Sequence, residues 1–340
     1  MKKLTILCLC LALGSLLNAQ IIALHHEGET QIFNGNTAFV QAYEASQAGD
    51  TLYFSGGTYF PPSKIDIQLT LFGAGHYQDS TLVTGKTIIS GSIKLKEGAN
   101  NFYIEGIAIS DKIEIDNNSP ITGLSVKRCY VSNGFNFPGD RTTLSSNIAI
   151  IGSIFGNSDF INTSNVLVSN SIISRVNNSH GNQFRNNIML ASFIYTSRLF
   201  NNSNNNFIAN SIIKIEGSGS SNIISGDGNQ FYNNVFNDAN PSYGSNPTLS
   251  DNIANVNMDD VFVNQTGVDF DYSHDYHLQD DELYLGTDGT QVGIYGGIFP
   301  YKEGAVPINP HFVKNTTSNT TNDDGDLPVR IIIKAQKDKD

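Results

Sequence analysis

The sequence predicts an all-β solenoid, a parallel β-helix in which one chain winds through a stack of short coils. Three observations predict it: a template of six residues recurs seven times, its fourth position is always apolar, and its sixth is almost always Asn or Gly. The copies start at residues 101, 123, 147, 165, 181, 205 and 228, in steps of 22, 24, 18, 16, 24 and 23. A repeat near twenty residues is typical of solenoids, whose coils bury their apolar faces only against one another.

The apolar fourth position predicts one inward site in each coil. It holds Ile104, Val126, Ile150, Val168, Phe184, Ile208 and Phe231. Short β-branched or aromatic pairs follow within a few residues, separated by polar turn residues and without a sustained helical period. These runs suit short strands of roughly 3–5 residues. Stacked in parallel at about 4.8 Å per coil, the strands place equivalent side chains above one another.

The sixth position predicts a sharp corner between two strands. It holds Gly106, Arg128, Gly152, Asn170, Asn186, Asn210 and Asn233. Asn and Gly adopt the left-handed backbone conformation most readily, and stacked Asn amides can hydrogen-bond along a column. We therefore interpret these Asn residues as a structural ladder and not as ligands. Arg128 interrupts the column, and two roles stay open for it, one in capping the ladder and one in a functional site.

The Asn column, the coil length and the apolar stacks resemble the pectin-lyase-like superfamily, in its secreted bacterial type. The resemblance covers roughly residues 30–300. It implies a single-stranded, right-handed parallel β-helix with an N-terminal capping helix and a short C-terminal tail. A shared fold does not by itself transfer a function.

The two ends of the chain predict its export and its domain organisation. Residues 1–19 combine two lysines, an apolar run and Ala19, which is typical of a signal peptide and predicts a secreted or cell-surface protein without a membrane span. Residues 20–300 form the predicted β-helix. An amphipathic helix over residues 36–46 is expected to cap its open end. Residues 301–326 are expected to be a flexible linker, and residues 327–340 a short strand with a charged end.

Charge and cysteine content restrict the partners. The formal net charge of −12 makes nucleic acid a poor match, and it disfavours acidic polysaccharides unless a basic patch or calcium compensates. Neutral glycans meet no such barrier. Cys129 is the one cysteine outside the predicted signal peptide, and we expect it to be a buried apolar side chain more than a reactive nucleophile.

Catalysis by a polysaccharide lyase is one alternative for the early coils. Such an enzyme removes a proton next to a uronate carboxylate, with a base and often calcium. Lys127 or Arg128 is the candidate base. Glu105 is expected beside Lys127 on the neighbouring coil, and Asp111, Glu114 and Asp116 are expected to gather near the same edge. The motifs of polygalacturonase-type hydrolases occur only as fragments, so a glycoside hydrolase is less favoured than a lyase.

Binding without catalysis is the interpretation we prefer. The outward fifth template position provides four candidate carbohydrate-binding residues, Glu105, Lys127, Arg185 and Tyr232. Aromatic rings stack on sugars with little need for charge. The prediction is a secreted β-helix protein that binds polysaccharide or a cell-surface partner, with no metal site and no cofactor except calcium in the lyase alternative. A structural adhesin is the second alternative, and the oligomeric state stays open.

Overall fold

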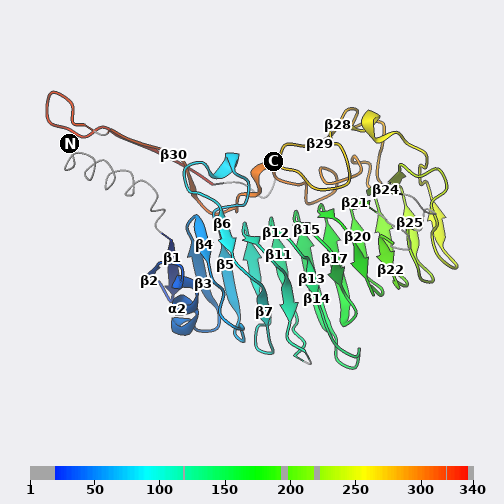
Figure 1. Cartoon of the computed structure of the whole chain (residues 1–340), viewed down its shortest axis with the longest axis horizontal. Coiled ribbons are helices and arrows are strands. Elements are labelled where there is room, and N and C mark those ends of the chain that lie inside the picture. Colours follow the sequence, from blue (N-terminus) through cyan, green and yellow to red (C-terminus); the bar gives the residue numbers. More distant parts are fainter. Residues whose placement is uncertain (1–19, 118, 193–197, 218–222, 319, 336–340) are drawn as a thin grey trace, which may run out of the picture.

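The computed structural model describes residues 20–117, 119–192, 198–217, 223–318 and 320–335. The main body is a parallel β-solenoid of about nine turns, which confirms the predicted fold class (Figure 1). The predicted signal peptide lies outside the described residues, as does the charged end after Ala335. No described helix is long and apolar enough to cross a membrane.

Three sheets form the walls of the solenoid, with twelve, nine and six strands. The first sheet consists, in spatial order, of β2 (Glu29–Asn34), β1 (Ile21–His26), β3 (Asp50–Phe54), β5 (Leu69–Phe72), β8 (Tyr103–Glu105), β11 (Ser125–Lys127), β14 (Ser145–Ile151), β17 (Thr163–Ser169), β20 (Gln183–Arg185), β23 (Phe207–Ala209), β25 (Gln230–Tyr232) and β27 (Thr248–Ser250). The second consists of β26 (Val235–Phe236), β24 (Ile212–Glu216), β21 (Ile188–Ser192), β18 (Ile172–Ile173), β15 (Ile154–Phe155), β12 (Tyr130–Val131), β9 (Ala108–Ile109), β6 (Thr87–Ile89) and β4 (Gly57–Tyr59). The third consists of β22 (Phe200–Asn201), β19 (Val176–Asn177), β16 (Ser158–Asp159), β13 (Phe135–Asn136), β10 (Ile113–Ile115) and β7 (Ile93–Leu95).

The seven template copies form seven successive strands of the first sheet, from β8 to β25. Their register is the predicted one, because Val126 pairs with Ile104 on one side and with Ile150 on the other. All three side chains are fully buried. The apolar fourth position therefore forms a continuous stack along the inside of the solenoid.

The N-terminal end of the solenoid is capped by α2 (Ala38–Ala45), within the predicted helix. Phe39 of α2 packs edge-to-face on Phe54, with the ring centroids 5.0 Å apart. Strands β1 and β2 form an antiparallel hairpin that continues the first sheet beyond β3. The hairpin was not predicted from the sequence.

The sixth template position forms the predicted corner between the first and second sheets. Every residue there is left-handed, from Arg128 and Asn233 at φ 50° to Gly106 at φ 70°. The predicted hydrogen bonding along this column is wrong, because these amides point outward. Asn170, for example, donates to the carbonyl of Ile294 at 2.8 Å.

The side-chain ladders lie inside the coils, one residue after the corner and at the second template position. The Ser171 N–H donates to Asn187 Oδ1 at 2.9 Å, and the Asn187 N–H donates to Ser211 Oγ at 3.1 Å. At the second position, the Asn182 N–H donates to Asn206 Oδ1 at 3.1 Å. These side chains satisfy buried backbone groups that would otherwise be costly.

Residues 285–308, here called the return segment, lie along the outward corner column. Asn233 donates to the Leu285 carbonyl at 3.2 Å, beside the late coils. The Ile308 N–H donates to Glu105 at 3.2 Å, beside the early coils. The chain thus turns back along the solenoid and contacts coils from near its end to near its beginning. The return segment includes the 3₁₀ helix η3 (Glu303–Ala305).

Short elements outside the three sheets complete the fold. They are η1 (Asp79–Thr81), η2 (Met258–Asp260), the antiparallel pair β28 (Phe262–Asn264) and β29 (Asp275–Leu278), and the antiparallel pair β30 (His311–Thr317) and β31 (Val329–Lys334). The predicted linker therefore contains a strand, β30. The predicted C-terminal strand is not alone, since β31 pairs with β30.

Candidate functional site

The outer face of the first sheet carries most of the sequence-predicted site residues. Lys127 pairs in register with Glu105 and Ile151, as the fifth template position requires. Arg185 and Tyr232 occupy the same position two coils apart, separated by Ala209. The structure thus places Lys127 on the early coils, and Arg185 and Tyr232 together on the late coils.

Arg185, Phe207 and Tyr232 form a continuous group, here called the platform. The Arg185 guanidinium carbon lies 4.2 Å from the centroid of the Phe207 ring. Phe207 stacks on Tyr232 with the centroids 5.3 Å apart and the planes 19° apart. All three side chains are half-buried. Phe207 was missed by the sequence analysis, although the third and fifth positions of a strand point to the same side.

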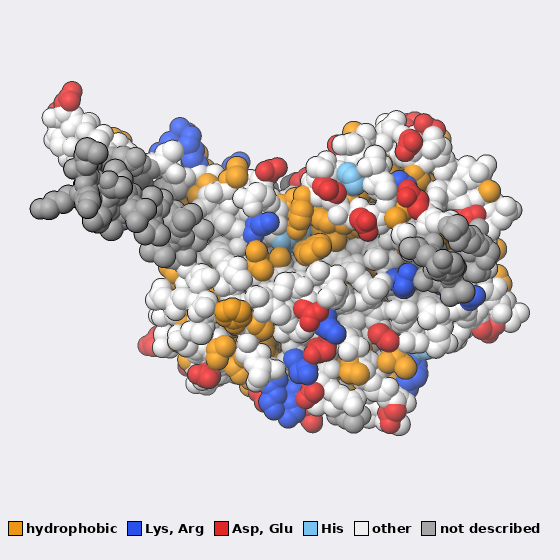
Figure 2. All heavy atoms as spheres, in the orientation of Figure 1, with side chains coloured by type: hydrophobic (Ala, Val, Ile, Leu, Met, Phe, Trp, Pro, Cys, Tyr) orange, Lys and Arg blue, Asp and Glu red, His pale blue; other side chains and the backbone are white. Residues whose placement is uncertain are grey.

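Tyr53, Phe72, Tyr103 and Lys127 form a second group on the early coils, here called the aromatic row. Tyr53 stacks on Phe72 at 5.5 Å and 15°, and Phe72 lies 5.6 Å from Tyr103. The Lys127 amine lies 5.6 Å from the centroid of Tyr103, within the range of a cation–π interaction. Figure 2 shows hydrophobic patches interspersed with charged side chains along the coils of the face in view.

Glu105 lies on the outer side of the sheet in register with Lys127, as predicted, but it is not exposed to solvent there. Glu105 is 0% exposed, and its carboxylate accepts hydrogen bonds from Tyr103 Oη and from the Ile308 N–H. Nε and Nη2 of Arg128 lie 2.7 and 2.6 Å from Glu105 Oε1. The physical reason is the return segment, whose Pro307 covers the Gly106 corner. Glu105 therefore anchors this segment and is not available to a glycan on the outer face.

Arg128 takes part in this buried pair, and only 10% of its side chain is exposed. The structure accounts for the break in the Asn/Gly column, because a cation at this corner neutralises the Glu105 carboxylate beneath the return segment. A guanidinium held by two contacts to a carboxylate is a poor general base. Lys127, the other candidate base, is not part of this ion pair.

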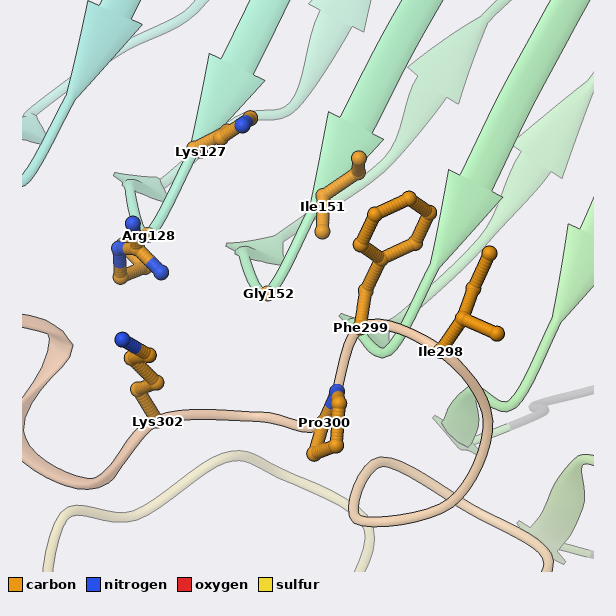
Figure 3. A pocket seen from close by; sticks show the side chains of 8 residues that line it. All are labelled: Lys127, Arg128, Ile151, Gly152, Ile298, Phe299, Pro300 and Lys302. Atoms are coloured by element: carbon orange, nitrogen blue, oxygen red, sulfur yellow. The ribbon is translucent and has the colours of Figure 1, made fainter. Parts of the chain in front are cut away.

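A pocket of about 120 Å³ lies between this corner and the return segment (Figure 3). Its lining residues are Lys127, Arg128, Ile151, Gly152, Ile298, Phe299, Pro300 and Lys302. In Figure 3, Lys302 extends from the return segment toward Arg128, while Phe299 lies over the Ile151 side. No carboxylate is among the lining residues, so the pocket offers cationic and apolar groups but no acid–base pair.

The carboxylates expected near Glu105 lie elsewhere, and that prediction is wrong. Glu114 belongs to β10 of the third sheet and pairs with Lys94 at 3.4 Å. Asp111 accepts hydrogen bonds from Ser92 and Asn133 at 2.5 and 2.8 Å. After β8 of the first sheet, the chain forms β9 of the second sheet and then β10 of the third. Asp111 and Glu114 therefore lie on another side of the solenoid from Lys127. Across the described ranges, no three His, Cys, Asp or Glu side chains are grouped as metal ligands.

An aromatic cluster around His76 covers part of the second sheet and was not predicted from the sequence. His76 is fully buried beside Tyr77, Tyr130 and Tyr272, and its Nδ1 lies 3.1 Å from Tyr272 Oη. Burial lowers the pKa of His76 to about 3, with a smaller effect of Lys86. Ring centroids only 4.7–6.2 Å apart leave no room for a ligand between the rings. The cluster is a packed structural cover.

Cys129 is also structural. It is fully buried, and burial raises the pKa of its thiol to about 12. This agrees with the expectation of an apolar, unreactive side chain.

No protein-family model matches the sequence, and comparison with curated proteins finds no match. What the fold and the surface define is a parallel β-solenoid with two aromatic groups, the platform and the aromatic row, on the outer face of its first sheet.

Proposed function

We propose that this protein is a secreted or surface-exposed β-helix protein of the pectin-lyase-like type that binds neutral polysaccharide along the outer face of its first sheet, without catalysis. The observation that supports the proposal is the alignment of two groups of aromatic rings on one face. Neighbouring parallel strands lie about 4.8 Å apart. An extended polysaccharide lying along this face would therefore meet aromatic rings at several places.

The chemistry of both groups suits sugar rings. The platform and the aromatic row offer apolar ring surfaces, and Arg185 and Lys127 add hydrogen-bond donors at their edges. Stacking on an aromatic ring requires no opposite charge on the ligand. A neutral glycan therefore avoids repulsion from a chain of net charge −12.

The lyase alternative has less support. Arg128 is held by Glu105, and the carboxylates expected to bind calcium beside Lys127 face other directions. Lys127 itself lies over the Tyr103 ring, a position that suits a binding residue.

A binding assay with matched variants tests the proposal. The chain from Gln20 to Asp340 is titrated with neutral and uronate polysaccharides, and affinity is measured by calorimetry or affinity electrophoresis. Phe207→Ala and Tyr232→Ala should each weaken binding by up to about tenfold, since an aromatic contact contributes about 0.5–1.5 kcal/mol. Phe60→Ala is the control, because Phe60 is 46% exposed next to β4 of the second sheet.

Three results would overturn the proposal. The first is the absence of glycan binding by the folded protein, and the second is an equal loss of binding in Phe60→Ala. The third is release of an unsaturated product from a uronate polysaccharide, followed by ultraviolet absorbance and abolished in Lys127→Ala, which would establish a lyase.

A further inference from the structure

The pocket between the Arg128 corner and the return segment depends on a glycine at residue 152. Gly152 occupies the sixth template position, where each of the next four copies holds Asn, and its φ of 58° is one that Asn also adopts. The nearest atoms to a Cβ there would be Arg128 Cγ at 3.7 Å and Tyr301 Cδ2 at 4.0 Å, which are ordinary contacts. On the next coil, Asn170 fills the corresponding position and donates to the return segment. The corner therefore accepts a side chain, and the glycine leaves a pocket of about 120 Å³ in its place.

Lys302 is directed into this pocket by the residue before it. Tyr301 is buried, its Oη lies 3.0 Å from Tyr77 Oη, and its N–H donates to the Ile294 carbonyl at 2.8 Å. Lys302 has an extended backbone, at φ −96° and ψ 124°, and successive side chains of an extended chain point to opposite sides. With Tyr301 anchored in the packed interior, Lys302 extends the other way, toward Arg128 (Figure 3).

The wall of the pocket carries an excess of positive charge. Three cationic side chains line it, namely Lys127, Arg128 and Lys302. Glu105 neutralises Arg128 but is not among the lining residues. Glu303, next to Lys302 in sequence, accepts a hydrogen bond from Tyr295 Oη at 2.5 Å. Bringing like charges together costs free energy, and in a chain of net charge −12 this local excess attracts an anion.

The rest of the wall is apolar and suits a carbon skeleton. Ile151 belongs to the first sheet, and Phe299 of the return segment lies over it, next to Ile298 and Pro300 (Figure 3). The volume is well below the roughly 300–1,000 Å³ of sites for drug-sized ligands. A sugar acid would place hydroxyl groups against this wall without hydrogen-bond partners, which is costly. The matching ligand is therefore small, with one anionic end and an apolar body.

We propose that this pocket binds a small carboxylic acid with an apolar body, whose carboxylate contacts Lys302 next to Arg128 and whose body packs on Phe299 and Ile151. An ammonium group forms strong, charge-assisted hydrogen bonds with carboxylate oxygens. Lys127, whose amine lies 5.6 Å from the centroid of the Tyr103 ring, adds positive charge to the same wall. Binding of the acid requires no glycan, so this site is independent of the function proposed above.

Calorimetric titration of the chain from Gln20 to Asp340 with benzoate and butyrate tests the proposal. Both should bind, whereas benzamide, which has the shape of benzoate without its charge, should bind at least about tenfold more weakly. Lys302→Gln should weaken benzoate binding by a similar factor. Lys64→Gln is the matched control, because Lys64 is exposed beside Ile65, which pairs with Leu95 of the third sheet. It should change benzoate affinity less than about twofold.

Gly152→Asn provides a second test, because its side chain would fill the pocket. Asn keeps the left-handed backbone of the corner, so the variant should fold and lose benzoate binding. Benzoate should raise the melting temperature of the unsubstituted chain and of Lys64→Gln, but not that of Gly152→Asn. Neither Gly152 nor Lys302 belongs to the platform or the aromatic row, so glycan binding should be the same in these variants.

Five outcomes would overturn the proposal. They are no benzoate binding at millimolar concentrations, equal binding of benzamide, equal effects of Lys302→Gln and Lys64→Gln, unchanged benzoate binding by Gly152→Asn, and tighter binding of inorganic phosphate or glucuronate than of benzoate. Loss of glycan binding with benzoate binding intact would count only against the function proposed above.

Discussion

The buried ion pair between Glu105 and Arg128 provides the sharpest test of how the return segment is attached. Glu105→Gln removes the charge of the carboxylate and keeps its size. Arg128, with only 10% of its side chain exposed, then faces a neutral amide where the carboxylate lay 2.6 and 2.7 Å from its Nη2 and Nε, so its charge is no longer neutralised by Glu105. Removing one partner of a buried pair costs about 3–5 kcal/mol, whereas a solvent-exposed pair contributes about 0–1 kcal/mol.

Replacing both partners should recover most of this loss. In Glu105→Gln combined with Arg128→Asn, no buried charge remains, and the corner receives the Asn that tolerates its φ of 50°. Glu114→Gln is the control, because Glu114 and its partner Lys94 are both partly exposed, and it should cost less than about 1 kcal/mol.

Thermal and denaturant unfolding measure these differences. At about 2 °C per kcal/mol for a large domain, Glu105→Gln should lower the melting temperature by about 6 °C or more. The reasoning is refuted if Glu105→Gln behaves like Glu114→Gln. It is also refuted if the double variant loses as much as the two single variants together.

Three further predictions concern buried groups. Asn187→Ala should destabilise the protein by about 1–3 kcal/mol in denaturant unfolding, because the Ser171 N–H loses its acceptor; a cost below 0.5 kcal/mol or so would contradict the ladder. His76 has a folded pKa of about 3 against an ordinary 6.5, so below pH 6.5 only the unfolded chain binds this proton. Its contribution to stability should fall by about 2 kcal/mol between pH 6.5 and 4.5, and His76→Phe should lack that component in unfolding curves at the two pH values. Cys129 should react with a thiol reagent at pH 8 only after unfolding, and labelling of the native protein would contradict its burial.

The repeating part of the fold was predictable because burial acts on every coil in the same way. One inward apolar side chain per coil imposes the register that joins Val126 to Ile104 and Ile150. The position of the amide ladder was predicted one residue too early. In pairs such as Asn186–Asn187, the sequence does not show which amide points inward, since this depends on the pleat on either side of the left-handed corner.

The candidate site was less predictable because it depends on distant segments. Alternation along β8 predicts an outward Glu105, and only a segment about 200 residues later buries it, through the Ile308 N–H. Phe207 was accessible to sequence reasoning, since it shares the outward side with the fifth position. The pairing of β30 with β31 was hidden by the Thr-, Asn- and Asp-rich composition between them, which is typical of a linker.

The return segment has a consequence for the order in which the protein acquires its structure. A solenoid whose coils contact only their neighbours can begin to fold from any coil and can lose its terminal coils one at a time. Here the last part of the solenoid domain to leave the ribosome binds coils from near Asn233 back to Glu105. Until it emerges, the corner amides and the Glu105 carboxylate lack their final partners. The coils are therefore expected to stay loosely assembled during synthesis and to become one cooperative unit only at the end.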